Sequence, residues 1–141
     1  MSNEIALMRE IARLQNQIDA LRTIEVGGVW TAYTPTITAG AGAFTTVAAT
    51  GFYSKLGNIA PIIISIAITT NGTASGSVIA TLPFTVDKTT IVVGRENVGT
   101  GNELQGFCAG AGNTMNIVTY NNLYPGGTGY VIYMSGFLSV A

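Results

Sequence analysis

The stretch Ile59-Ala-Pro-Ile-Ile-Ile-Ser-Ile-Ala-Ile-Thr69 is the longest apolar run of the chain and predicts a buried β-strand. It is far shorter than the ~20 residues that a membrane-spanning helix needs. Successive side chains of a strand point to opposite faces of the sheet, so we expect one face to be core. That face carries Ile62, Ile64, Ile66 and Ile68. The opposite face carries Ile63, Ser65 and Ala67, and its small apolar side chains predict close contact with another sheet or subunit.

The last predicted strand, Gly129–Val140, is also apolar on both faces. One face carries Tyr130, Ile132, Met134 and Leu138, and the other carries Val131, Tyr133 and Phe137. This pattern predicts a central strand that lines a subunit interface. The alternative is a strand covered on both faces within one sandwich. Together with Ile63, the residues Val131, Tyr133 and Phe137 are our candidates for a head-to-head interface.

The rest of the chain after Gly28 alternates Val-, Ile-, Thr-, Tyr- and Phe-rich segments with Gly, Asn, Pro and Ser clusters. This alternation is typical of an antiparallel sandwich or barrel. Asn71-Gly72 is a strong turn signal. The further strands that we expect are Trp30–Thr38, Phe44–Ala49, Gly51–Lys55, Ser77–Leu82, Thr90–Val93, Leu104–Ala109 and Met115–Tyr120.

The N-terminal segment is different, because its apolar residues follow a heptad pattern. Leu7, Leu14 and Leu21 occupy d positions, and Ile11 and Ile18 occupy a positions. A helix with such a stripe requires copies of itself or a partner groove. The alternative is an amphipathic helix packed on its own head. The residues at e and g carry too few charges to decide the number of strands in a coil.

All 18 glycines, all 4 prolines and every aromatic residue follow Val26. We therefore expect two parts: a coiled-coil segment over residues 1–26 and a β head over residues 27–141. The helix should end near Thr23, and Gly27-Gly28 should act as a hinge between the two parts. The N-terminal segment carries charges inside its helix, so we do not expect it to be a signal peptide.

Charge is sparse throughout the chain. The formal net charge is −1, and charged residues make up 9% of the sequence, against roughly 25% in a typical soluble domain. We therefore expect neither a nucleic-acid partner nor membrane insertion. A head so poor in charge would be weakly soluble alone, which favours a surface covered by neighbouring subunits.

The residue types needed for catalysis are scarce. The chain has no His, which excludes Ser-His and Cys-His pairs. We predict no enzymatic activity, no cofactor and no metal site, and we expect Cys108 to be a small buried residue. The loop residues Tyr120, Asn122 and Tyr124 form a polar-aromatic group. They are candidates for binding sugar or protein, although ordinary loop chemistry explains them equally well.

Several short motifs resemble a known pattern. They are Trp30-Thr-Ala-Tyr-Thr-Pro-Thr36, Gly51-Phe-Tyr-Ser-Lys-Leu-Gly-Asn-Ile59, Ser75-Gly76 and Thr81-Leu-Pro-Phe84. In this order they resemble bacteriophage fibre-tip and head-decoration domains. The resemblance covers most of residues 30–84, and none of its motifs is catalytic.

The resemblance implies a homotrimer with an antiparallel jelly-roll-like β-sandwich head behind a coiled-coil stalk, located on the virion. The short stem favours the capsid surface over the tail. We expect a decoration or cement protein that binds the phage capsid protein. The alternative is a receptor-binding fibre tip that recognises a host surface glycan. A non-viral assembly module is a third reading.

Overall fold

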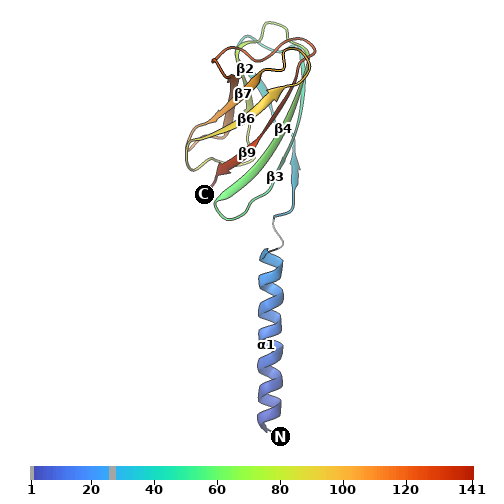
Figure 1. Cartoon of the computed structure of the whole chain (residues 1–141), viewed down its shortest axis with the longest axis vertical. Coiled ribbons are helices and arrows are strands. Elements are labelled where there is room, and N and C mark those ends of the chain that lie inside the picture. Colours follow the sequence, from blue (N-terminus) through green and yellow to red (C-terminus); the bar gives the residue numbers. More distant parts are fainter. Residues whose placement is uncertain (1, 26–27) are drawn as a thin grey trace.

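The computed structural model describes residues 2–25 and 28–141 of the chain, with side chains from residues 2–21 in the first segment. A helix, α1 (Ser2–Glu25), is followed by a curled β-sheet (Figure 1). The predicted hinge at Gly27-Gly28 lies partly outside the described residues, as does the boundary that we drew between residues 26 and 27.

Helix α1 has 24 residues and is therefore about 36 Å long. Its sequence contains neither Gly nor Pro, and Glu4 lies in the first turn, where a negative charge interacts favourably with the helix dipole. The helix continues two residues beyond the predicted end at Thr23. It projects away from the strands along the long axis of the molecule (Figure 1).

Within the described residues, nine strands form one antiparallel sheet in the order β1-β3-β4-β9-β6-β7-β8-β5-β2. The prediction of a mainly β, antiparallel head after an N-terminal helix is therefore confirmed. The strands are β1 (Thr31–Tyr33), β2 (Ile37–Ala41), β3 (Thr46–Tyr53), β4 (Ile59–Thr70), β5 (Ser75–Thr81), β6 (Thr90–Glu96), β7 (Glu103–Cys108), β8 (Thr114–Thr119) and β9 (Val131–Ser139).

The sheet curls so strongly that its two edges approach each other. β1 and β2 are consecutive in the chain, yet they pair with β3 and β5 at opposite edges of the sheet. The Tyr33 hydroxyl donates a hydrogen bond to the carbonyl oxygen of Thr81, 3.3 Å away, and so links β1 to β5. The Thr36 N–H donates a second hydrogen bond to the same residue, at 2.8 Å from Thr81 Oγ1.

Two predictions about where one strand ends and the next begins are wrong for identifiable reasons, and most other strand bounds differ from the predicted ones by one to three residues. The predicted strand Trp30–Thr38 is two strands, because the buried Pro35 lies where the chain crosses from one edge of the sheet to the other. The predicted strands Phe44–Ala49 and Gly51–Lys55 are one strand, because β3 continues through Thr50 and Gly51. A Cβ at Gly51 would lie 2.3 Å from the Tyr33 ring, so this glycine makes room for the neighbouring strand.

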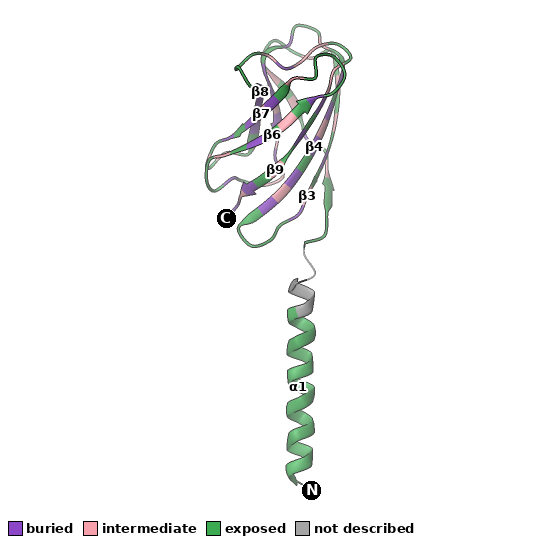
Figure 2. Cartoon of the chain, viewed as in Figure 1, coloured by how far each residue is buried: buried purple, intermediate pink, exposed green. Residues whose placement is uncertain are grey.

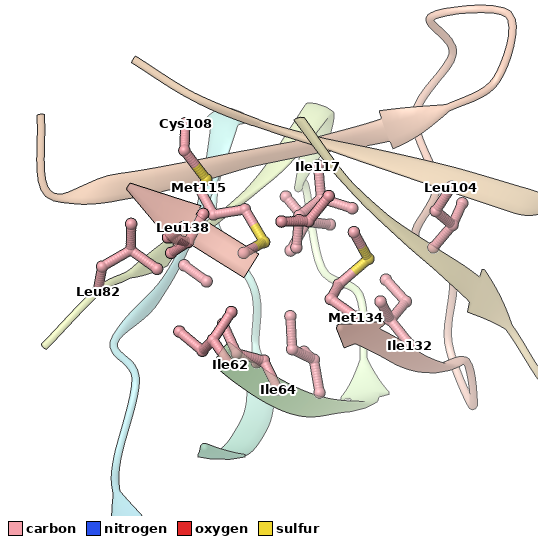
Figure 3. Close-up of a cluster of buried hydrophobic side chains, with 14 of the residues drawn as sticks. Ile62, Ile64, Leu82, Leu104, Cys108, Met115, Ile117, Ile132, Met134 and Leu138 are labelled. Atoms are coloured by element: carbon pink, nitrogen blue, oxygen red, sulfur yellow. The ribbon is translucent and has the colours of Figure 1, made fainter. Parts of the chain in front are cut away.

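The core lies inside the curl and follows the predicted alternation. The isoleucines of β4 on the predicted core face are at most 1% exposed: Ile62, Ile64, Ile66 and Ile68. The residues between them face outward (Figure 2). Met115 and Met134 meet them from other strands, together with the buried Cys108 (Figure 3). The predicted core face of β4 and the buried position of Cys108 are confirmed.

Candidate functional site

The heptad stripe of α1 is uncovered in the chain by itself. All described side chains of the helix are exposed (Figure 2). The stripe residues are between 45% and 61% exposed: Leu7, Ile11, Leu14, Ile18 and Leu21. Among the described residues, no strand packs against the helix. The alternative of a helix packed on its own head therefore does not hold for this structure, and the stripe is free to meet another chain.

A second uncovered apolar surface lies on the outer face of the sheet. We call it the outer patch and define it by Phe52, Ile63, Ile91, Val93, Phe107, Tyr133 and Phe137, all at least 43% exposed. The register brings several of these residues together. Phe52 of β3 pairs with Ile63 of β4, and Ile63 pairs with Ser135 of β9, whose other partner is Val93 of β6.

The predicted interface residues of the head lie on or beside this patch. Ile63, Tyr133 and Phe137 are members of it, and Val131 on the same strand is half-buried. β9 is hydrogen-bonded to β4 and β6, so its predicted central position is confirmed. Its outer face is not covered within the chain, since Phe137 is 69% exposed.

A pocket on the outer face of β6, β7 and β8 combines apolar and amide side chains. We call it the amide pocket. It has a volume of about 280 Å³, and its lining residues are Ile91, Gln105, Phe107, Asn116, Val118 and Asn122. The Gln105 Nε2 donates a hydrogen bond to Asn122 Oδ1 at 2.9 Å, which fixes two of the three amides relative to each other.

The loop after β8 positions Asn122 through a buried hydroxyl. Thr119 is 4% exposed, and its Oγ1 accepts a hydrogen bond from the Leu123 N–H at 2.9 Å. The Asn122 N–H donates to the Thr119 carbonyl oxygen at 2.9 Å. Asn122 itself has a φ of +62°, a left-handed conformation that Asn tolerates better than most residues.

The three predicted ligand-loop residues do not converge on one site. Asn122 lines the amide pocket, and Tyr120 is 68% exposed. Tyr124 is half-buried and packs against the core, and its hydroxyl donates a hydrogen bond to Asn71 Oδ1. Burial raises the pKa of Tyr124 above its usual value. The role that we predicted for these residues in ligand binding stays a prediction.

Sequence reasoning missed the most tightly bound carboxylate of the head. Glu96 is 1% exposed, at the end of β6. Its carboxylate accepts hydrogen bonds from the N–H groups of residues 98 to 101 and from the Thr100 hydroxyl. Burial alone would raise the pKa of Glu96, but the N–H donors outweigh it and lower the pKa to about 2. The available signal in the sequence was an acidic residue two positions before the Gly-rich turn Val98-Gly-Thr-Gly101.

The described residues include no cluster suited to a metal ion. They contain no group of three or more His, Cys, Asp or Glu side chains that could hold a metal ion. Burial raises the pKa of Cys108 to about 11, so its thiol stays protonated near neutral pH. No helix in the described part of the chain has the length and apolar character needed to cross a membrane.

Comparison with known proteins identifies no relative: no family model, curated protein or solved structure matches this chain. Its function must therefore be argued from the surfaces described above.

Proposed function

We propose that this chain is a non-enzymatic structural protein that acts as a homotrimer and decorates an assembled bacteriophage capsid. The observation that carries the assembly part is the pair of uncovered apolar surfaces, one on the helix and one on the sheet. In the proposed trimer the stripe of α1 forms a parallel coiled coil, and the outer patch contributes to contacts between heads.

The energetic argument for assembly starts with α1. An isolated helix gains little stability in water, and its apolar stripe would remain exposed to solvent. Burial of apolar surface contributes about 25 cal/mol per Å², so association of the stripes stabilises the helix and the assembly together. The exposed aromatic rings of Tyr133 and Phe137 add apolar area of the kind found at the centres of subunit interfaces.

The viral part of the proposal rests on the motif resemblance in residues 30–84. In this reading the nine-stranded sheet is the jelly-roll-like head, and α1 is the stem. Trimer valency gives avidity only where matching sites are fixed in space, so the protein would bind assembled capsids and leave free capsid subunits largely unbound. A ligand that binds only the assembled shell also stabilises that shell by mass action.

The decisive experiment images virions made with and without the protein by electron cryomicroscopy. The expected result is knob-shaped density on the capsid surface that disappears when the protein is absent. Particles without the protein should still form but lose integrity at a lower temperature. Density at the tail tip with a bare capsid would instead identify a receptor-binding fibre tip and overturn the capsid assignment.

A further inference from the structure

The amide pocket is chemically unlike the rest of the outer face. Three primary amides, from Gln105, Asn116 and Asn122, meet above side chains that are largely apolar. Each amide offers one carbonyl acceptor and two N–H donors. The Asn116 side chain makes no hydrogen bond to another described residue, and the Gln105–Asn122 bond leaves Gln105 Oε1 and the Asn122 amide nitrogen available.

The pocket is also organised before any ligand arrives. Asn122 keeps its left-handed φ of +62° because the buried Thr119 accepts hydrogen bonds from the N–H groups of Asn122 and Leu123. Non-glycine residues in this conformation persist where the surrounding structure imposes them, and they cluster at ligand-binding sites. A rigid arrangement of donors and acceptors lowers the entropy cost of binding a small polar molecule.

We propose that the amide pocket binds a neutral saccharide. None of its lining residues carries a charge, which disfavours phosphate, carboxylate and ammonium ligands. Ile91, Phe107 and Val118 supply an apolar wall, so the ligand needs an apolar face together with hydroxyl groups. A pyranose ring has both, because its C–H face can pack on Phe107 while its hydroxyls bond to the amides. The volume of about 280 Å³ lies near the lower end of small-molecule sites, which suits a monosaccharide unit.

This inference goes beyond the proposed assembly function, which concerns contacts between copies of the chain. The predicted interface residues lie on β4 and β9, whereas the pocket lies on β6, β7 and β8, further along the curled sheet. Ile91 and Phe107 belong to both the outer patch and the pocket, so the pocket stays accessible where contacts between heads use the part of the patch on β3, β4 and β9.

Saturation-transfer NMR on the full-length protein tests the proposal with methyl glucoside, methyl galactoside, methyl mannoside and N-acetylglucosamine as probes. We expect saturable binding of at least one pyranoside, with a Kd of about millimolar for so small a ligand. Three variants should each weaken this binding at least about tenfold: Phe107→Ala, Asn116→Ala and Asn122→Gly. The glycine in the last variant keeps the left-handed turn while it removes the amide.

Asn113→Ala is the matched control, since Asn113 is an exposed amide three residues from Asn116 and outside the pocket lining. It should bind like the unsubstituted protein. The proposal is overturned if no pyranoside binds saturably, or if all variants bind alike. It is equally overturned if Phe107→Ala dissociates the oligomer, because the pocket is then a subunit contact. The trimer proposal is tested separately, by the mass of the unsubstituted protein in solution.

Discussion

The carboxylate of Glu96 organises the loop between β6 and β7. Backbone N–H groups from residues 98 to 101 converge on it, and the Gly99 N–H lies within 2.9 Å of both carboxylate oxygens. A buried charge is costly unless it is well hydrogen-bonded, and here the loop supplies all the donors. The turn and the charge therefore stabilise each other, and removal of the charge should loosen the turn.

We expect Glu96→Gln to lower the free energy of unfolding by about 3 kcal/mol at pH 7. The pKa of this group is about 2 in the folded state against 4.5 ordinarily, so its contribution is complete above about pH 4.5. The contribution is lost as the pH falls toward 2, because protonation then favours the unfolded chain. Urea unfolding at fixed protein concentration, at pH 7 and at pH 3, measures the difference between the two proteins.

The matched control for Glu96→Gln is Glu103→Gln, which removes a carboxylate that is exposed on β7. This variant should change the unfolding free energy by less than about 0.5 kcal/mol. If the gap between Glu96→Gln and the unsubstituted protein stays constant from pH 7 to pH 3, the carboxylate does not carry the stabilisation that we assign to it.

At the scale of the element, α1 gives the sharpest prediction. Replacing Ile11 and Ile18 with Asp places two charges in the proposed seam, each costing several kcal/mol if it stayed ionised and buried. The stalk should separate into single helices, which lose the packing of the apolar face that supplies most of a helix's stability in proteins. Circular dichroism should show a loss of helical signal, and limited proteolysis should cut within residues 1–26.

The matched control adds the same charges away from the seam, as Ala6→Asp and Asn16→Asp. Both residues are exposed on α1 and outside the heptad positions a and d. This double variant should keep its helical signal and its protease resistance. Equal behaviour of the two double variants would show that the stripe is not a helix–helix contact.

The sequence was sufficient to predict elements with regular periodicity. The alternating isoleucines of β4 predicted both a strand and its buried face, because period-two patterns report burial directly. The division that we predicted between Ala49 and Gly51 and the continuous strand that we predicted through Pro35 are wrong, since a glycine or proline in a strand pattern has more than one cause. Gly51 accommodates the Tyr33 ring, and Pro35 marks a crossover between sheet edges. Both causes depend on contacts between strands far apart in the sequence.

The candidate site was less predictable for the same reason. Asn122 was identified because it lies in a polar-aromatic loop, but Gln105 and Asn116 join it from β7 and β8. Nothing local to either residue indicates a shared pocket, because the register of neighbouring strands brings them together. The stripe on α1 was visible in the sequence because heptad spacing is local.

For the whole molecule, we expect a mass of three chains of 14.6 kDa by light scattering at micromolar concentration. The Ile11→Asp, Ile18→Asp variant should remain trimeric through its heads. Adding Phe137→Glu to it should yield monomers, because a charge then lies in the outer patch. Leu123→Glu, at an exposed apolar loop residue, is the control addition and should leave the trimer intact. A monomeric unsubstituted protein would contradict the assembly proposal.

The position of β9 has a consequence for biosynthesis. β4 is made early but finds its second neighbour only when residues 131–139 have left the ribosome, so the core cannot close before β9 emerges. The first two strands to be made, β1 and β2, lie at the edges of the sheet, whereas the last, β9, lies in its interior. A chain that stops after Thr128 should leave the isoleucine face of β4 open and bind a hydrophobic dye. A nascent chain therefore stays exposed to chaperones until β9 inserts beside β4, and this insertion closes the core.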